Sequence, residues 1–320
     1  MTLAVLYKLL ALMATVALGW LTARMGWLGR LAQGSDPARV ISNAAFYLFV
    51  PALMFRTMAR QDLSALPWRM LLAYFVPALL FTLAFHAWQR RKGTLPAAEP
   101  ATRAIIAVYG NAVQLGIPLA AALFGEAGLA LHIALVSLHG LVLLTVLTVL
   151  VESDLARQNP ASLAATLRTT LRNSLVHPVV LPVLAGLLYN FSGLALHPVL
   201  DEALQVLGSA VVPVCLVLIG VSLATYGVRG GLRLALGLSV FKLLLFPALV
   251  LVVAHGGFGL AGVPLAVLVM MAALPVGSNA LIFSQRYGTL EAETTVTILV
   301  STVAFMVTAT LWLALLGWLG

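Results

Sequence analysis

Two long apolar segments of the chain, residues 105–124 and 266–285, are each interrupted near the middle by residues that break a helix. The first interruption reads Asn111-Ala-Val-Gln-Leu-Gly-Ile-Pro118, and the second reads Leu274-Pro-Val-Gly-Ser-Asn279. Lipid offers no hydrogen bonds to the backbone, so irregular backbone at membrane depth persists only where it lines a cavity or is buried in protein. Two such breaks in corresponding places of two halves are typical of a transporter binding site.

The composition indicates an all-α polytopic membrane protein, because 62% of the 320 residues are hydrophobic and only 9% are charged. A net charge of +8 would suggest a nucleic-acid partner in a soluble protein, but here the basic residues lie in short loops between apolar segments. We therefore expect the lipid bilayer as a partner, and no nucleic acid. Cys215 is the single cysteine, so no intrachain disulfide and no thiolate metal site can form. We expect no metal and no cofactor.

Windows of about 20 apolar residues predict ten transmembrane helices. These spans cover residues 3–23, 38–58, 67–88, 103–124, 128–151, 173–192, 199–226, 232–254, 263–285 and 294–317. Five spans in each half is an odd number, so two structural repeats would have to be inverted across the membrane.

Three parts of the chain follow from this pattern: a first five-helix repeat, a linker and a second, inverted five-helix repeat. The linker contains leucines every four residues beside arginines, which predicts a short helix lying along the membrane surface. The three parts are residues 1–151, 152–172 and 173–320.

The distribution of Lys and Arg predicts the orientation in the membrane, because cytoplasmic loops carry the excess of positive charge. Thirteen of these residues belong to one set of alternate loops, and three belong to the other. We therefore expect both termini outside, with the linker in the cytoplasm.

Pro118 and Pro275 explain how the two breaks expose backbone groups. A proline lacks an amide hydrogen and its ring clashes with the carbonyl four residues earlier, which frees the carbonyls of Gln114 and Met271. The half-helix ends that result carry partial charges, positive at N-termini and negative at C-termini. The alternative is that these prolines only kink helices whose neighbours satisfy the freed groups.

Uncharged polar side chains accompany both breaks, and each needs hydrogen-bond partners once it is removed from water. A binding cavity supplies such partners, so we favour a substrate site over simple kinks. The candidate substrate-binding residues are Asn111, Gln114, Pro118, Pro275, Ser278, Asn279 and Lys242.

Lys242 lies near the middle of the eighth predicted span, too deep for its side chain to reach either membrane surface. Its ammonium could pair with a carboxylate substrate, or it could rest against free carbonyls in a structural role. The sequence leaves both open.

The predicted spans carry no Asp or Glu at mid-depth, so the carboxylate relay that is typical of proton pumps is missing. Oxygen atoms of Ser137, Ser278 and Asn279 could still hold a small cation. His132 and His139 are seven residues apart and share a helical face, where they could relay protons or simply pack. Ser137 and His139 are the candidate ion-coupling residues.

The segment from Tyr109 to Pro118 resembles the fourth-helix motif Asn-Thr-x-x-x-Gly-x-Pro of the auxin efflux carrier family, which includes plant PIN-formed carriers and bacterial malonate and malate permeases. Further similar stretches follow in the expected order along nearly the whole chain. They are residues 46–56, 212–224, 242–247 and 273–287.

This resemblance implies a five-plus-five inverted repeat of the bile-acid-symporter type, in which the fourth and ninth helices cross as broken helices. It also implies that Asn111 is a binding residue, and Gly110 stands where plant carriers have proline. The sodium sites of the related bile acid symporters use an acidic residue in the ninth helix, and residues 274–280 contain none. The resemblance therefore favours transport without sodium.

We predict a secondary transporter that moves a small organic anion across the cytoplasmic (inner) membrane of a bacterium by alternating access at these breaks. The substrate would be a mono- or dicarboxylate that is either auxin-like or malonate- or malate-like. The first, second, sixth and seventh spans would form a scaffold against which the others move. The membrane potential, negative inside, would drive an anion outward.

A homodimer is compatible with this prediction. Three alternative functions differ from it. The first, a sodium- or proton-coupled symporter, stays open. An intramembrane enzyme would need a nucleophile with a base, or a metal or paired-carboxylate constellation, and the sequence shows no such motif. A ligand sensor built on a transporter fold would normally add a soluble output domain.

Overall fold

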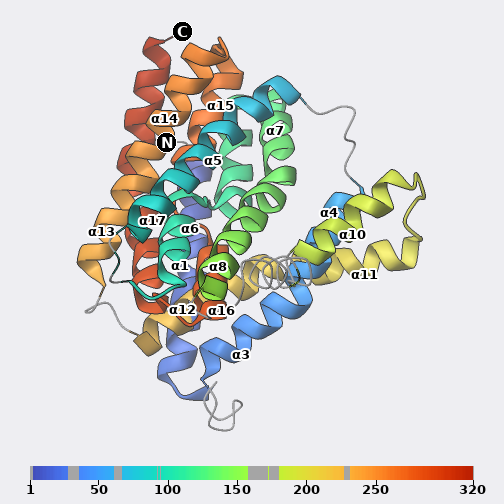
Figure 1. Ribbon diagram of the computed structural model, residues 1–320, viewed down its shortest axis with the longest axis vertical. Helices are drawn as coiled ribbons and strands as arrows, with labels where there is room; N and C mark the ends of the chain where they lie inside the picture. The colour runs from blue at the N-terminus through green and yellow to red at the C-terminus, as the bar shows by residue number, and fades with distance from the viewer. Residues whose placement is uncertain are drawn as a thin grey trace.

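The computed structural model describes residues 3–27, 36–60, 67–91, 93, 95–157, 172, 180–226 and 231–319. Every regular element in these described ranges is helical, as the ribbon shows (Figure 1). The first half contains α1 (Leu3–Arg24), α3 (Pro37–Ala44), η1 (Ala45–Phe49), α4 (Val50–Ala59), α5 (Trp68–Arg90), α6 (Glu99–Val108), η2 (Ala112–Gly116), α7 (Ile117–His139), η3 (Gly140–Leu144) and α8 (Thr145–Arg157).

The second half is also helical in its described residues, and the symbol η marks short π-helical turns within longer helical stretches. It contains α10 (Val180–Phe191), α11 (Pro198–Ser209), α12 (Val211–Tyr226), α13 (Leu232–Val240), η4 (Phe241–Leu245), α14 (Phe246–Val252), η5 (Val253–Gly257), α15 (Gly262–Ala273), α16 (Ser278–Tyr287) and α17 (Glu291–Trp318). Most of the predicted surface helix, residues 158–171, lies outside the described residues.

Six helical stretches within the described ranges are long and apolar enough to cross a membrane, which agrees with the prediction of an all-α membrane protein. They are Pro37–Ala59, Trp68–Arg90, Leu119–Arg157, Pro198–Thr225, Leu232–Gly257 and Glu291–Trp318. The stretch that includes α7 bends sharply at Gly125, where φ is 63°, a left-handed conformation that glycine adopts without strain.

Proline explains three of the π turns. Pro51, Pro118 and Pro247 each follow a π turn by two residues, at the ends of η1, η2 and η4. The proline ring would clash with the carbonyl four residues earlier in a regular α-helix. The turn before the proline takes one extra residue, which makes it a π turn and relieves the clash. Each π turn rotates the side chains that follow it relative to those before.

Close backbone contact joins α1 to α12. A Cβ atom added to Gly19 would collide with the carbonyl of Val217, and one added to Gly220 would collide with the carbonyl of Val16. Small residues at a helix interface allow such an approach, and dispersion contacts then hold membrane helices together.

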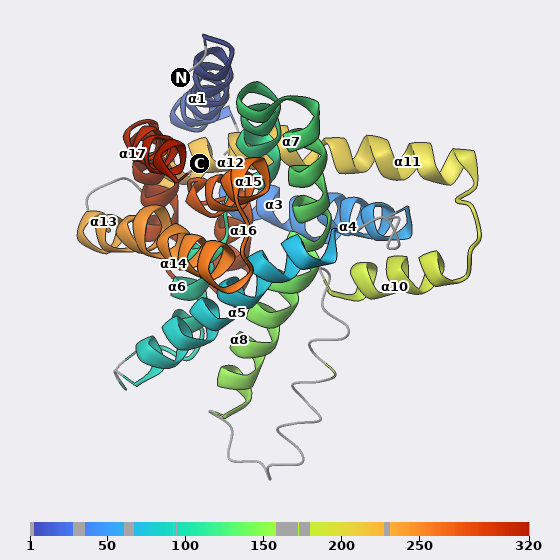
Figure 2. The same cartoon turned by 90° about the horizontal axis from the view of Figure 1, so that it is seen from above.

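A second group of helices, α4, α10 and α11, lies together on one side of the molecule in both views (Figures 1 and 2). Nε of Arg56 in α4 is 2.8 Å from the Asp201 carboxylate of α11, and Nη1 of Arg60, the residue that follows α4, is 2.5 Å from it. Asn190 of α10 donates to the carbonyl of Met58, near the end of α4, at 3.0 Å. These polar contacts satisfy charges and helix-end carbonyls at the rim of an otherwise apolar packing.

Candidate functional site

The two predicted breaks lie side by side. After α6 the chain is extended at Tyr109, and after α15 it is extended at Leu274. The Asn111 N–H donates to the Pro275 carbonyl at 2.8 Å, and the Gly277 N–H donates to the Tyr109 carbonyl at 3.0 Å. These bonds form an isolated antiparallel bridge between residues 110 and 276. Each break therefore satisfies backbone groups that the other leaves open.

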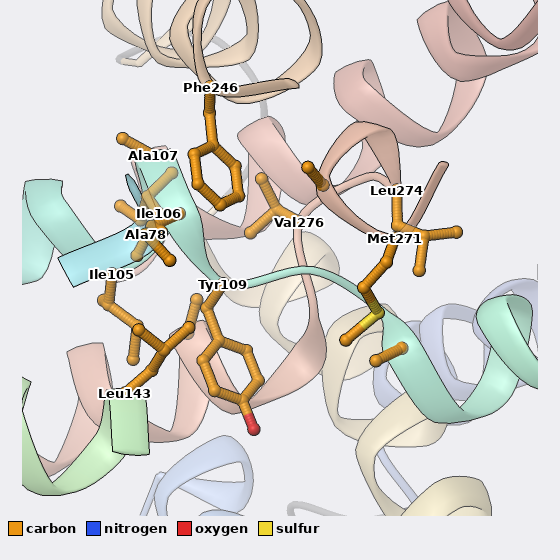
Figure 3. Close-up of a cluster of buried hydrophobic side chains, with 14 of the residues drawn as sticks. Ala78, Ile105, Ile106, Ala107, Tyr109, Leu143, Phe246, Met271, Leu274 and Val276 are labelled. Carbon is orange, nitrogen blue, oxygen red and sulfur yellow. The ribbon is translucent and has the colours of Figure 1, made fainter. Parts of the chain in front are cut away.

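Apolar side chains surround this bridge on most sides. Figure 3 shows Ala78 of α5, Ile106 of α6, Phe246 of α14 and Met271 of α15 gathered around the extended segment beside Tyr109. All four are buried. This packing excludes lipid and water from the unwound backbone, which is the condition for irregular structure at membrane depth.

Gly277 allows the two segments to approach. A Cβ atom at this position would lie 2.7 Å from the carbonyl oxygen of Gly110. Gly110 is less tightly enclosed, since its Cβ would lie 3.3 Å from the Leu274 Cβ. The close contact therefore depends mainly on the glycine of the second break.

Side chains satisfy the backbone groups that the bridge does not. Ser301 Oγ accepts from the Val276 N–H at 3.1 Å, and His132 Nε2 lies 2.9 Å from the Ala112 carbonyl oxygen. The Lys242 ammonium donates to the Ala272 carbonyl at 2.5 Å. Three elements distant in sequence thus hold the unwound backbone in place.

A cavity of about 240 Å³ lies against one side of the bridge. Its polar side chains come mainly from the two breaks and from the helix that follows Gly125. The residues that line it are Leu53, Met54, Thr57, Met58, Tyr109, Gly110, Asn111, Ala112, Val113, Ile117, Val136, Ser137, His139, Gly140, Leu141, Val183, Val211, Val212, Gly277, Ser278 and Asn279. None of these is Asp, Glu, Lys or Arg.

Two residues of the cavity wall, Asn111 and His139, carry buried polar atoms without hydrogen-bond partners among the described residues. His139 is only 2% exposed, and within the described part of the chain neither of its ring nitrogens has a hydrogen-bond partner. The Asn111 Oδ1 atom likewise has no partner there. Leaving a buried polar group unpaired costs about 1–3 kcal/mol. Asn111 Oδ1 can only accept a hydrogen bond, so a ligand would pair with it through a donor group, whereas a His139 ring nitrogen can pair with either kind of group.

Neighbouring side chains fix the positions of these groups. The His139 ring lies 4.4 Å from the Tyr109 ring, centroid to centroid. Asn279 Nδ2 donates to Tyr109 Oη at 3.0 Å, so the two breaks are also connected through side chains. Ser137 Oγ donates to the Ala134 carbonyl within its own helix, which leaves its oxygen lone pairs available.

The positive ends of two half-helices adjoin the same cavity. Asn111 and Gly277 are the N-caps of η2 and α16, and neither N-cap residue caps its helix through a side chain. The first N–H groups of a helix have no intrahelical acceptors, and the helix dipole favours a negative charge near them. The cavity can therefore hold an anion without any basic side chain.

The candidate site residues from the sequence fall into two groups. The structure brings Asn111, Ser137, His139, Ser278 and Asn279 to the cavity wall. It does not bring Pro275 or Lys242 there, although both contact the bridge. Gln114 and Pro118 have backbones in η2 and α7, but their side chains lie outside the described residues.

Sequence reasoning missed Tyr109 as a site residue. It is almost fully buried, lines the cavity, and contacts both His139 and Asn279. The sequence did offer one indication of this role: Tyr109 is a polar aromatic residue in an apolar segment, two residues before Asn111.

Polar and ring contacts connect helices beyond Asn279, near the C-terminal end of α16. Arg286 Nη1 donates to Tyr47 Oη at 2.7 Å, and its guanidinium lies 5.3 Å from the Phe46 ring centroid. Arg39 Nη2 is 3.3 Å from the Glu291 carboxylate. These contacts join the α3–η1 segment to the end of α16 and the start of α17.

Comparison with known proteins supports a transport role for this arrangement. The family model described as "Membrane transport protein" matches residues 4–313. This chain belongs to the membrane transport protein family. The resemblance to auxin efflux carriers noted in the sequence is thereby confirmed.

This membrane transport protein is also similar to a curated protein of Rhizobium meliloti (strain 1021) that is named "Putative malonate transporter". The two are 26% identical over 313 residues, which cover 92% of this chain and 90% of the relative. The family identifies an integral membrane transporter of a small molecule, and not an enzyme.

Proposed function

We propose that this membrane transport protein is a secondary transporter that moves a small organic anion, a mono- or dicarboxylate, by alternating access at the paired breaks. The observation that carries the proposal is the cavity, whose wall combines two helix N-termini that lack side-chain caps with the polar side chains of Asn111, His139 and Asn279. The name of the Rhizobium relative favours malonate as the first substrate to try.

The proposed site holds a carboxylate between the two breaks. The side-chain amides of Asn111 and Asn279 act as donors, together with those first-turn N–H groups of η2 and α16 that are not already bonded, as those of Ala112 and Ala280 are; His139 offers a further ring N–H. Hydrogen bonds to a charged group contribute about 1.5–3 kcal/mol each, and a helix N-terminus adds about 0.3–1 kcal/mol. The apolar remainder of the wall, including Leu53 and Val212, would contact the carbon skeleton of the substrate.

The proposed architecture has ten crossings in two inverted five-helix repeats, with both termini outside and the fourth and ninth helices broken. Two features support it: the breaks pair antiparallel to each other, and both chain ends lie in the upper part of Figure 1. We assign α1, α3, α4, α10, α11 and α12 to a scaffold, because these elements contact one another closely. The cavity lies between the scaffold and the paired breaks.

Proposed alternating access then consists of closing the cavity and opening the contacts around Arg286. An anion exported from a bacterium would gain about 2.3 kcal/mol per charge for each 100 mV of membrane potential. Export therefore needs no coupling ion. A proton-coupled cycle is the second candidate, and the specific observation in its favour is that, within the described residues, both ring nitrogens of the buried His139 are without partners.

Uptake of labelled malonate and other small carboxylates into proteoliposomes, at clamped potential and pH, tests the proposal. We expect Asn111→Ala to lower the uptake rate at least tenfold, since it removes polar groups at the cavity wall. The matched control is Asn43→Ala, because Asn43 is exposed on α3. A folded Asn111→Ala protein with unchanged uptake would show that the site is elsewhere. A proton-coupled cycle would instead make uptake follow an imposed pH gradient.

A further inference from the structure

The Lys242 ammonium occupies a buried position beside the C-terminal end of α15, where it donates to the carbonyl of Ala272. Its residue belongs to η4, in the middle of the helical stretch from Leu232 to Gly257, and is 0% exposed. Nζ donates to the Ala272 carbonyl at 2.5 Å and lies 5.2 Å from the Phe246 ring centroid. A buried ammonium is costly unless its surroundings replace the water it has lost.

The C-terminal end of α15 supplies those surroundings. The last carbonyls of a helix have no intrahelical donors, and here the usual donors are missing or diverted. Pro275 has no N–H, the Val276 N–H bonds Ser301 Oγ, and the Gly277 N–H bonds the Tyr109 carbonyl. The carbonyls of residues 271–273 are thus left without helical hydrogen bonds, and the lysine takes the middle one.

The end of α6 lies beside the same ammonium. Element η4 contacts α6, and a Cβ atom on Gly110 would lie 3.5 Å from both Lys242 Nζ and the Met271 carbonyl oxygen. The negative ends of two half-helices therefore meet near one positive charge. No ion pair of the described residues includes Lys242, so carbonyl oxygens and an aromatic face are what balance it.

This position is distinct from the proposed substrate cavity. Lys242 does not line the cavity, and the bridge between residues 110 and 276 separates the two. The positive N-terminal ends of η2 and α16 adjoin the cavity, and the negative C-terminal ends of α6 and α15 lie toward Lys242. A charge pair between Lys242 and a substrate carboxylate does not fit this arrangement.

We propose that Lys242 is a tethered monovalent cation, which fills a carbonyl-lined cation site formed by the C-terminal ends of α15 and α6. Unwound carbonyls and half-helix C-termini hold free alkali cations in other transporters, and carbonyl oxygens can replace a cation's hydration shell. In this protein the cation is the Lys242 ammonium, which is attached to the chain through its own side chain. Shortening the side chain leaves a site for a free alkali cation of sodium or potassium size.

The consequence for transport, which rests on the proposed function, is that the wild-type cycle runs without sodium because the cation is never released. The proposal that a free alkali cation binds when the Lys242 side chain is shortened does not depend on transport. It can therefore be tested on the purified protein without any substrate.

The test compares Lys242→Ala with Lys242→Met in thermal unfolding of the purified full-length protein. Sodium, lithium or potassium chloride replaces choline chloride at constant ionic strength. We expect both variants to unfold at lower temperature than wild type in choline. Sodium or potassium should raise the midpoint of Lys242→Ala saturably, by about 5 °C at 100 times the dissociation constant. The methionine side chain fills the space, so Lys242→Met and wild type should show no such rise.

Three results would overturn the proposal. The first is a folded Lys242→Ala protein that responds to none of the three cations, and the second is wild-type protein whose midpoint depends on sodium. The third is an alanine variant that cannot be recovered even when these cations are present throughout purification, because a free ion should then restore the site. The two proposals can fail separately. If the thermal-unfolding results are as expected but the wild-type protein does not transport carboxylates, the cation site is supported and only the transport proposal is refuted.

Discussion

Replacing Gly277 by alanine tests whether the paired breaks hold the structure together. Its φ and ψ of −82° and 152° suit any residue, so only the space around the new methyl group matters. That group would lie 2.7 Å from the Gly110 oxygen and 3.3 Å from the Asn111 nitrogen. Both are backbone atoms, so relief requires the two segments to move apart.

The cost follows from what this movement breaks. The two hydrogen bonds between the segments contribute about 0.5–1.5 kcal/mol each, and overpacking a rigid site costs about 1–3 kcal/mol. We therefore expect Gly277→Ala to lower the free energy of unfolding by about 2–6 kcal/mol. At about 2–4 °C per kcal/mol, the thermal midpoint in detergent should fall by about 5–20 °C.

The matched control is Gly237→Ala. Gly237 lies inside α13, and apart from its chain neighbours and its own helix backbone no atom of the described residues lies within 4 Å of the position that an alanine Cβ would take. Alanine there should raise stability by about 0.5–1 kcal/mol. Gly110→Ala should lie between the two, because its methyl group would meet the Leu274 Cβ at 3.3 Å, a milder overlap than the 2.7 Å at Gly277. Equal midpoints for Gly277→Ala and Gly237→Ala would refute the reasoning.

Two further changes probe the packing on either side of the cavity. Gly220→Ala should lower the thermal midpoint by several degrees, because its methyl group collides with the Val16 carbonyl and forces α1 away from α12; an unchanged midpoint would contradict this close contact. Arg286→Ala removes a hydrogen bond to Tyr47 and two ring contacts, together worth about 1–2 kcal/mol, and should increase maleimide labelling of a Phe283→Cys variant roughly tenfold. Unchanged labelling would show that these contacts do not keep that end closed.

The sequence predicted the two breaks well because proline and the absence of backbone partners in lipid act locally. Residues 109–111 and 274–277 are unwound, as expected from Pro275 and the polar residues near Asn111. The role of these residues in binding stays a prediction, as does the inverted repeat.

The side of the bridge on which each polar group lies could not be predicted from the sequence. Hydropathy gives the depth of a residue in the membrane, so Lys242 and Asn111 were both placed at mid-depth. The direction of a side chain depends on the rotation of its helix, and each π turn changes that rotation by an amount that no periodicity reveals. Lys242 lies within such a turn and points to the carbonyl side, away from the cavity.

The bridge between the breaks also constrains how the chain is made. Tyr109 and Asn279 are 170 residues apart, so at about 5–20 residues per second the ribosome needs roughly 10–30 s to deliver the second after the first. During that interval the open amide and carbonyl groups near Asn111 have no partner, and bare hydrocarbon would penalise each by several kcal/mol. The nascent first half must therefore wait beside the translocon or an insertase, and a truncated chain that ends before α15 should be degraded rather than accumulate in the bilayer.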